Sequence, residues 1–471
     1  MLGSYNRLNT SAFHFSICLK ISSFEVPECG LSHSLPIDSF IGSPLSLILP
    51  RPRSLNIVQH RLFLMVRSEA TSQPRVSALA KRVHGWSWQA FPIGMGTGAV
   101  YVTLSGITAR SPTLTLVETV FYFLNMSLFL LNTLTLLTQA IVYPRQAWRL
   151  LNDPVKGIFV PLVVLSFATI IIGTINYAVP PGHVSPEFIY ALFWHGLCWV
   201  RMLDLFSNAD DLVQPTSRPD SFHSGICIFS ISDGQSNMLV GVISFNVLRT
   251  MSPEDTRAVG VLVAGYFFQG IGFFMTFFYL CIYIIRIMTT GFLDGHQANG
   301  AFVACGPPGF TALALLKLGD RARIILPAHG LISPTAGEIW YASSAMAALM
   351  LYGLAVFFFV FGILPYWFKL HKHLHEILGC WALTFPNVGW ISTTRVLADL
   401  FHIPGFTYIH FAMAVLMCAT WAILFVLTVI AFWKGLIFCS EDEDVLKDMK
   451  DSSTHTTPMH EAKPSTTNNM V

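Results

Sequence analysis

The sequence predicts an all-α membrane protein, with ten transmembrane helices paired as five helical hairpins around a central pore. Composition predicts the membrane class, because 53% of the 471 residues are hydrophobic and only 11% are charged. Soluble domains carry about 25% charged residues, so a soluble chain of this length could not cover so much apolar surface. The recurrence of apolar runs predicts the number of helices, and the placement of proline among those runs predicts their arrangement.

The two ends of the chain are predicted to lie outside the membrane domain. Residues 1–83 are rich in Ser and Pro and hold no long apolar run, which predicts a disordered arm. Alternatively, this stretch is upstream sequence wrongly joined to a chain that begins at Met65. Residues 84–438 form the expected ten-helix domain. The tail over 439–471 opens with the acidic run Glu441–Asp444 and ends in Ser, Thr and Asn, so we expect it to be polar, disordered and cytoplasmic.

Ten apolar runs are long enough to cross a bilayer, since about 20 helical residues span roughly 30 Å of hydrocarbon. The fifth run is the weakest, because Asp233, Gln235 and Asn237 interrupt it. An even number of spans places both termini on one side of the membrane. The predicted spans are residues 88–107, 116–142, 157–179, 187–206, 226–248, 259–287, 299–318, 342–368, 377–398 and 406–433.

Loop charge predicts that both termini are cytoplasmic. With this orientation, more Lys and Arg residues flank the cytoplasmic ends of the spans than the outer ends, as the positive-inside rule requires. The margin is small, because the outer end of the seventh span holds the cluster Lys317, Arg321 and Arg323.

Proline is distributed unevenly between odd-numbered and even-numbered spans. Proline within a membrane helix frees a carbonyl, which lipid cannot satisfy but a pore or a neighbouring helix can. We therefore expect the odd helices to be kinked and to line a central conduit, with straight even helices outside. The even spans hold only Pro365, at an end, whereas the odd spans hold Pro92, Pro161, Pro307, Pro308 and Pro386.

Charge and motifs exclude several classes of function. The formal net charge is only +2, from 28 Lys and Arg against 26 Asp and Glu, so no basic footprint for nucleic acid is present. No phosphate loop, dinucleotide fingerprint or HExxH motif occurs, so ATP-driven transport within this chain is unsupported. A membrane enzyme would need paired histidines or carboxylates at mid-membrane depth, and the runs offer no convincing set. We expect no cofactor, and lipid as the surrounding partner.

Three motifs are similar to one family of membrane proteins. Residues 88–98 (WQAFPIGMGTG) resemble the first helix of the tellurite-resistance/dicarboxylate transporter family, and residues 305–312 (CGPPGFTA) resemble its seventh helix in fungal malate permeases. Residues 381–389 (WALTFPNVG) resemble its ninth helix. The resemblance covers about residues 84–438. The family includes bacterial dicarboxylate transporters, yeast malate permeases, fungal sulfite pumps and plant slow anion channels.

The resemblance implies a ten-helix subunit of five hairpins around a pore, assembled as a homotrimer in the plasma membrane. A phenylalanine of the ninth helix occludes the pore in such proteins, and the matching residue here is Phe385. An aromatic ring closes a narrow pore by filling it and by dewetting the constriction. The alternative is that Phe385 is one of 38 phenylalanines and packs between helices.

The same resemblance implies a substrate path and a substrate. The GPPGF sequence favours malate and related C4-dicarboxylates, moved with or without protons; the alternative is efflux of sulfite or another small inorganic anion. Glycines let the backbone approach an anion closely, although a kink needed only for packing would explain them too. Arg395 either attracts anions or extends to the membrane interface. The implied path comprises Pro92, Gly94, Gly96, Gly98, Gly306, Pro307, Pro308, Gly309, Phe310, Thr384, Pro386 and Arg395.

Two segments do not fit the resemblance directly. Residues 207–237 show no family pattern, and we interpret them as a retained intron or a misassigned exon. His371, His373 and His375 with Glu376 supply several metal-ligand types on one loop. A transporter of organic anions needs no metal, so we expect these residues to be an ordinary cytoplasmic anchor and predict no metal site.

Overall fold

The fold is described from a computed structural model, which describes residues 76–153, 156–198, 237–291, 300–368 and 376–454. These residues belong to one compact unit and are helical, with no strand among them. Most of the segment without a family pattern, and the three loop histidines, lie outside the described residues.

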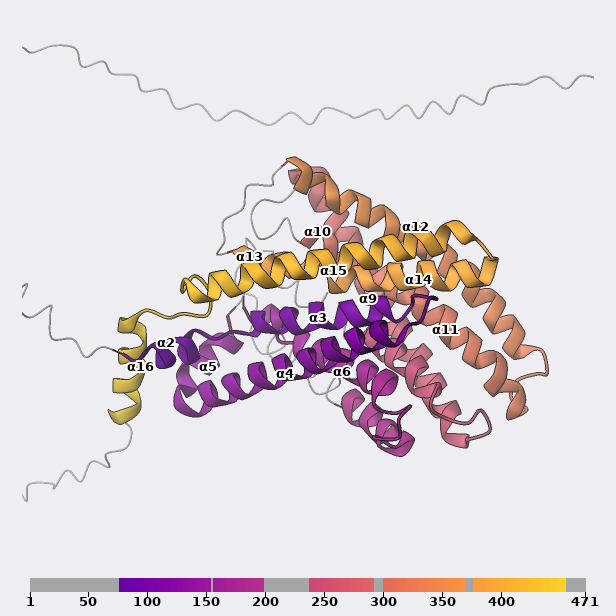
Figure 1. The fold of residues 1–471 in the computed structure, drawn as a ribbon, viewed down its shortest axis with the longest axis horizontal. Helices are drawn as coiled ribbons and strands as arrows, with labels where there is room; N and C mark the ends of the chain where they lie inside the picture. The colour runs from indigo at the N-terminus through magenta and orange to yellow at the C-terminus, as the bar shows by residue number, and fades with distance from the viewer. Residues whose placement is uncertain (1–75, 154–155, 199–236, 292–299, 369–375, 455–471) are drawn as a thin grey trace, which may run out of the picture. The chain divides into compact units, whose positions relative to one another are not determined.

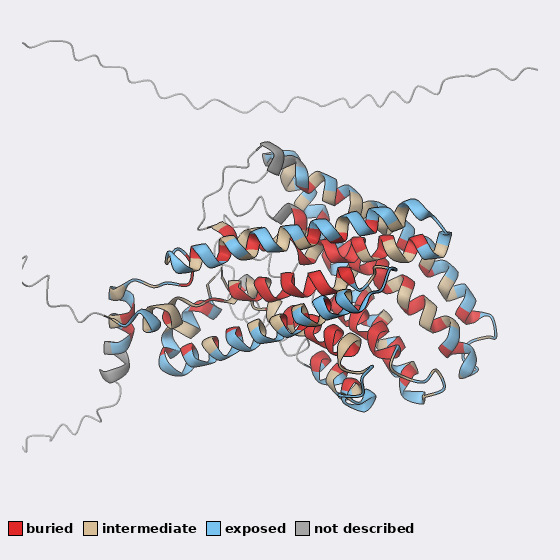
Figure 2. Cartoon of the chain, viewed as in Figure 1, coloured by how far each residue is buried: buried red, intermediate tan, exposed pale blue. Residues whose placement is uncertain are grey.

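Five helices form an inner ring, and nearly every residue of their central portions is buried. They are α3 (Phe91–Leu104), α6 (Leu162–Tyr177), the helix Asn237–Leu248, α11 (Gly306–Ala328) and α14 (Phe385–Phe401). They correspond to the odd-numbered predicted spans, and Figure 2 shows α3 and the neighbouring interior helices almost wholly buried.

The remaining long helices lie outside the ring. They are α4 (Pro112–Val142), a helix over 186–198, α9 (Thr256–Thr290), α12 (Ala336–Phe368) and α15 (Pro404–Trp433). In the most apolar 18-residue stretch of α4, α9, α12 and α15, only 17–22% of the residues are buried. Figure 1 labels α4 and α15, and Figure 2 shows both largely exposed. Many of the exposed residues on these four helices are large hydrophobic ones. Apolar surface of this length is stable only against lipid.

Glycine contacts on α3 bring the first half of the ring together. An ideal Cβ at Gly96 would lie 2.6 Å from the Thr384 Oγ1 that precedes α14, and a Cβ at Gly98 would lie 2.8 Å from the Thr169 Cβ of α6. Only residues without a side chain allow helices to approach this closely.

The other half of the ring closes through polar and apolar contacts. Thr311 Oγ1 of α11 donates to the sulfur of Met238 at 3.4 Å. Helix α6 and the helix Asn237–Leu248 jointly line a small apolar cavity, and α11 packs along α14. Each inner helix therefore contacts the next one around a shared interior.

The prolines differ from the expectation of kinks within continuous helices. Pro92, Pro307 and Pro386 occupy the first turns of α3, α11 and α14, and Pro161 is the N-cap of α6. A proline in the first turn removes an amide that has no helical partner and needs no bend. Short segments precede these starts: η1 (Trp88–Ala90), η2 (Gly157–Phe159), α10 (Gly300–Val303), α13 (Ile377–Cys380) and η5 (Trp381–Leu383). These four prolines therefore lie at breaks where new helices start, instead of inside continuous helices as predicted.

Four of the described helices are long and apolar enough to cross a membrane by themselves, namely α4, α9, α12 and α15. The inner helices are shorter or, in α11, carry charges, so they depend on the outer helices for burial. Each predicted span coincides with helix in the described residues, while the count of ten crossings stays a prediction.

Helices are present beyond both predicted boundaries of the membrane domain. Helix α2 (Ala78–Gly85) lies within the end of the predicted disordered arm, and α16 (Asp442–Thr454) lies within the predicted disordered tail. The two helices pack together: the His84 ring contacts the Asp448 carboxylate at 3.0 Å, and Lys81 pairs with Asp442 at 2.7 Å. Arg149 of α5 (Pro144–Leu151) also pairs with Asp448. Composition missed α16 because its acidic residues find cationic partners far away in sequence.

Candidate functional site

Two phenylalanine rings meet where α11 and α14 begin. Phe310 and Phe385 are both buried, and their ring centroids lie 5.0 Å apart with an interplanar angle of 30°. Phe385 is the first residue of α14, and Phe310 lies just beyond the Gly-Pro-Pro-Gly start of α11. The two motifs identified in the sequence are therefore adjacent in space.

A small cavity adjoins this aromatic pair. Four of the five inner helices contribute to its wall, so it lies toward the interior of the ring. Its volume is about 20 Å³, which is room for about one water molecule. A hydrated or carboxylate-bearing molecule does not fit into this cavity. The lining residues are Leu165, Met238, Leu239, Gly306, Pro307, Phe310, Phe385 and Pro386.

Backbone contact fixes the relative positions of α11 and α14. An ideal Cβ at Gly309 would lie 2.7 Å from the backbone nitrogen of Trp390, and a Cβ at Gly389 would overlap the backbone of Phe310. Thr393 Oγ1 also donates across the interface to the Gly309 carbonyl at 3.3 Å. Both glycines are required here because backbone, rather than a flexible side chain, occupies the space.

A polar cluster supports the aromatic pair from one side. The Asn387 Oδ1 atom accepts a hydrogen bond from Trp390 Nε1 at 2.8 Å and lies 3.3 Å from the Cys305 sulfur. Thr384 is fully buried, and its hydroxyl donates to the Trp381 carbonyl at 2.7 Å. These bonds hold the break before α14 in one conformation.

The start of α11 offers fewer anion-binding amides than the glycine motif suggests. Pro307 and Pro308 have no amide hydrogen, and the Gly309 amide donates to the Cys305 carbonyl at 3.2 Å. The Gly306 backbone lies against α14, where an ideal Cβ would be 3.5 Å from the Pro386 Cα.

The three glycines of α3 contact neighbouring helices. A Cβ at Gly94 would lie 3.1 Å from Asn125 Oδ1 and 3.2 Å from Ser166 Oγ, while Gly96 and Gly98 face the break before α14 and helix α6. None of the three, nor Pro92, borders the cavity beside the aromatic pair.

Arg395 lies away from the aromatic pair, near the C-terminal end of α14. Its Nε donates to the Gly106 carbonyl at 3.0 Å, and its Nη1 pairs with Asp399 at 2.6 Å. These bonds join α14 to the end of α3 and occupy much of the guanidinium.

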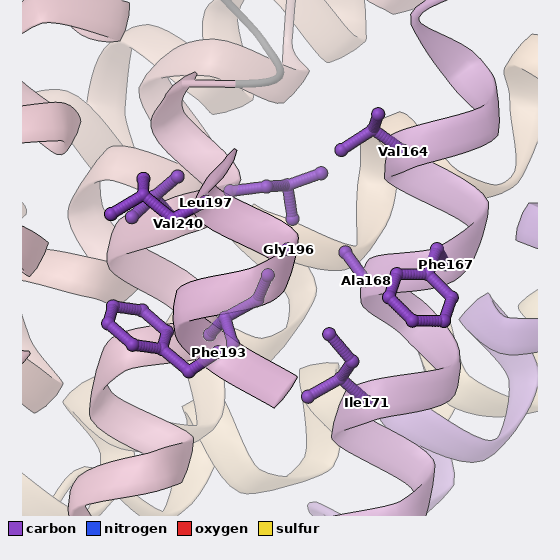
Figure 3. A pocket seen from close by; sticks show the side chains of 10 residues that line it. Val164, Phe167, Ala168, Ile171, Phe193, Gly196, Leu197 and Val240 are labelled. Atoms are coloured by element: carbon purple, nitrogen blue, oxygen red, sulfur yellow. The ribbon is translucent and has the colours of Figure 1, made fainter. Parts of the chain in front are cut away.

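A second cavity lies between α6 and its neighbours, and Figure 3 shows only apolar side chains pointing into it, among them Phe167, Ile171 and Phe193. Its volume is about 10 Å³, at the lower limit for one water molecule. It is a packing void without polar groups that could orient a substrate.

Sequence reasoning missed several contributors to the occluded cavity. Leu165, Met238 and Leu239 are apolar residues inside apolar runs, so nothing in their pattern distinguishes them from lipid-facing residues. No group of His, Cys, Asp or Glu side chains that could hold a metal occurs among the residues that the structure describes.

Short buried helices inside a shell of long helices with apolar, exposed surfaces define a multi-pass integral membrane protein. The chain belongs to the voltage-dependent anion channel family SLAC1, whose model matches residues 85–429. The predicted family is thereby confirmed, and the protein is an anion transporter or channel of that family rather than an enzyme.

Fungal transporters of two kinds are among its relatives. A malic acid transport protein of Schizosaccharomyces pombe is 25% identical over 386 residues, covering 78% of this chain and 83% of that protein. A sulfite efflux pump of Trichophyton rubrum is 23% identical over 350 residues, covering 73% of this chain and 89% of the pump. A second S. pombe protein, described as a putative malic acid transport protein, is 24% identical over 393 residues, covering 82% of this chain and 88% of that protein.

Proposed function

We propose that the protein moves malate and related C4-dicarboxylates along the axis of the inner ring, and that Phe385 is the gate. The observation that supports this most directly is the Phe310–Phe385 pair beside a cavity with room for one water. Apolar rings at a constriction exclude water, and a carboxylate cannot pass without its hydration or a replacement for it.

The position of Phe385 at a helix start suits a moving gate. Inside a helix the preceding turn restricts the rotamers of a side chain, and Phe385, as the first residue of α14, has no preceding turn of its own helix to restrict it. The neighbouring crossing at Gly309 and Gly389 is rigid by contrast, since backbone packs on backbone. Rotation of the Phe385 ring away from Phe310 would open the path while the crossing stays fixed.

The GPPGF motif and the two malic acid transport proteins support malate as substrate. Moving one net negative charge inward against an inside-negative potential costs about 2.3 kcal/mol per 100 mV. Uptake of malate therefore needs protons or a monoanion, whereas export runs down the potential.

The remaining site and assembly assignments belong to the same proposal. The path includes the glycines and prolines that start α3, α11 and α14, together with Thr384 and Arg395. The protein works as a homotrimer in the plasma membrane with both termini cytoplasmic, and crosslinking of the full chain in membranes tests the trimer.

Sulfite efflux is the second candidate function, because sulfite pumps match this chain at 23–24% identity. Uptake into vesicles that contain the purified full chain separates the two. We expect labelled malate to enter faster than labelled sulfite, and faster than into protein-free vesicles. Sulfite transport without malate transport would overturn the malate assignment in favour of the pump.

A further inference from the structure

Lys317 lies on the same face of α11 as the aromatic constriction. It follows Phe310 by seven residues, which is two helical turns, or about 10 Å along the axis. The side chain is half-buried. Among the described residues, no carboxylate forms an ion pair with its ammonium group, although the charges of Asp320 and Asp399 act on it from further away.

The two nearby carboxylates already have partners. Asp320 pairs with Arg323 at 3.2 Å and with Arg321 at 3.8 Å, and Asp399 pairs with Arg395 at 2.6 Å. Among the described residues, therefore, no carboxylate pairs directly with Lys317, and Asp320 and Asp399 act favourably on its charge only from a distance.

A second inner helix brings another cation to Lys317. Arg249 follows the helix Asn237–Leu248, which contacts α11 through Met238 and Thr311. Arg321 lies one helical turn beyond Lys317 on α11, and the charges of both arginines repel that of Lys317. The Arg249 Nη1 atom donates at 3.2 Å to the side-chain oxygens of Asn176 and Asn246, which orient the guanidinium without neutralising it. Like charges held together in a partly buried place are costly unless an anion joins them.

Helix dipoles do not explain this arrangement. A cation is stabilised by a helix C-terminus only within about the last turn. Arg249 satisfies that condition, but α11 continues to Ala328, eleven residues beyond Lys317. The dipole of α11 therefore does not stabilise the charge of Lys317. Because Lys317 lies two turns beyond the Phe310–Phe385 pair, an anion next to that pair could do so.

We propose that Lys317, Arg249 and Arg321 form a binding site for a small carboxylate anion, between the aromatic pair and the C-terminal ends of the inner helices. The substrate class rests on the proposed function. The Lys317 ammonium offers three donors to one carboxylate, and the guanidinium groups offer paired donors to another. Lys317, Arg321 and Arg323 lie toward the end of α11 that the predicted orientation places outside the cell, where the positive-inside rule predicts few cations. An anion-binding site explains why they are there.

Binding is tested on the purified full chain in detergent by following thermal unfolding as malate is added. The variants are Lys317→Gln, which removes the charge, and Lys317→Arg, which keeps it. The control is Lys434→Gln, at an exposed lysine beyond the end of α15. Loss of one charge near the anion should raise the malate concentration needed for a given stabilisation by about tenfold. Wild type, Lys317→Arg and Lys434→Gln should respond alike.

Unfolding without malate distinguishes binding from a structural role. Removing a half-buried charge that has no direct ion pair should leave the unfolding temperature of Lys317→Gln equal to or above that of wild type. A lower unfolding temperature with an unchanged malate response would show that Lys317 is structural and would overturn the proposal. Absence of any malate response in wild type would overturn it as well.

Flux measurements separate this site from the proposed function. In vesicles, Lys317→Gln should raise the half-saturating malate concentration about tenfold. Malate flux with the same half-saturation in wild type and Lys317→Gln refutes the site while the transport function stands. Absence of flux in every variant, with a Lys317-dependent thermal response, refutes transport of malate while the binding site stands.

Discussion

Replacing Phe385 with alanine separates a gate from a packing residue. The ring lies against Phe310 with centroids 5.0 Å apart and borders a cavity of about 20 Å³. Removing it enlarges that space in the interior of the inner ring. A gate at this position predicts more anion flux per folded molecule, whereas a packing residue predicts less folded protein and no extra flux.

The structure sets the expected magnitudes. Loss of a buried phenylalanine ring costs about 3–5 kcal/mol in a packed core, of which the contact with the second ring contributes about 0.5–1.5 kcal/mol. Because Phe385 already borders a void, we expect Phe385→Ala to lower the free energy of unfolding by about 3 kcal/mol. Each 1.4 kcal/mol removed from the barrier raises flux about tenfold, so a ring that contributes about 3 kcal/mol to closure gives roughly 100-fold more flux.

The assay is malate efflux or anion current, normalised to folded protein at the surface. Phe358→Ala is the matched control, since Phe358 is fully buried on the outer helix α12 and does not line the occluded cavity. It should lose comparable stability and gain no flux. If flux per molecule for Phe385→Ala stays level or falls, Phe385 is a packing residue and the gate lies elsewhere.

Three further predictions follow from particular contacts. Gly389→Ala forces α11 and α14 apart, so thermal unfolding in detergent should show a loss of about 1–3 kcal/mol; an unchanged unfolding temperature would contradict the backbone contact. Asp448→Asn weakens the pairing with His84 and Arg149, so amides of α16 should exchange with solvent at least about tenfold faster; equal exchange would show that other contacts hold the helix. Cysteines placed along α11 should react with a water-soluble thiol reagent at helical periodicity once Phe385→Ala opens the path, and greater labelling along α4 would refute the arrangement of inner and outer helices.

The sequence predicted the arrangement of the helices well, because that information is local. Runs of apolar residues are required wherever a helix meets lipid, and proline and glycine are tolerated only where protein surrounds the backbone. Proline placement alone, however, predicted that Pro92, Pro307 and Pro386 lie inside continuous helices, whereas each lies in the first turn of a helix. Whether a proline bends a helix or starts one depends on the few residues before it, whose conformation the apolar pattern does not reveal.

The candidate site was predicted in part. Phe385 and Phe310 were identified from separate motifs, but nothing in either motif states that their rings touch. Arg395 was interpreted either as a residue that attracts anions or as one that extends to the membrane interface. Its bond to the Gly106 carbonyl is visible only once α3 and α14 are adjacent. The acidic tail lacked any apolar pattern, so its helix could not be found without its cationic partners on α2 and α5.

By itself, the sequence determined the membrane class, the alternation of inner and outer helices and the family, because hydropathy and short motifs are properties of contiguous residues. Only the tertiary structure decided which of these residues face one another. Gly309 meets Trp390 and Phe310 meets Phe385 across an interface between segments far apart along the chain. Such contacts depend on how two helix surfaces fit at van der Waals distance, and that fit is a property of the packed interior rather than of either segment alone.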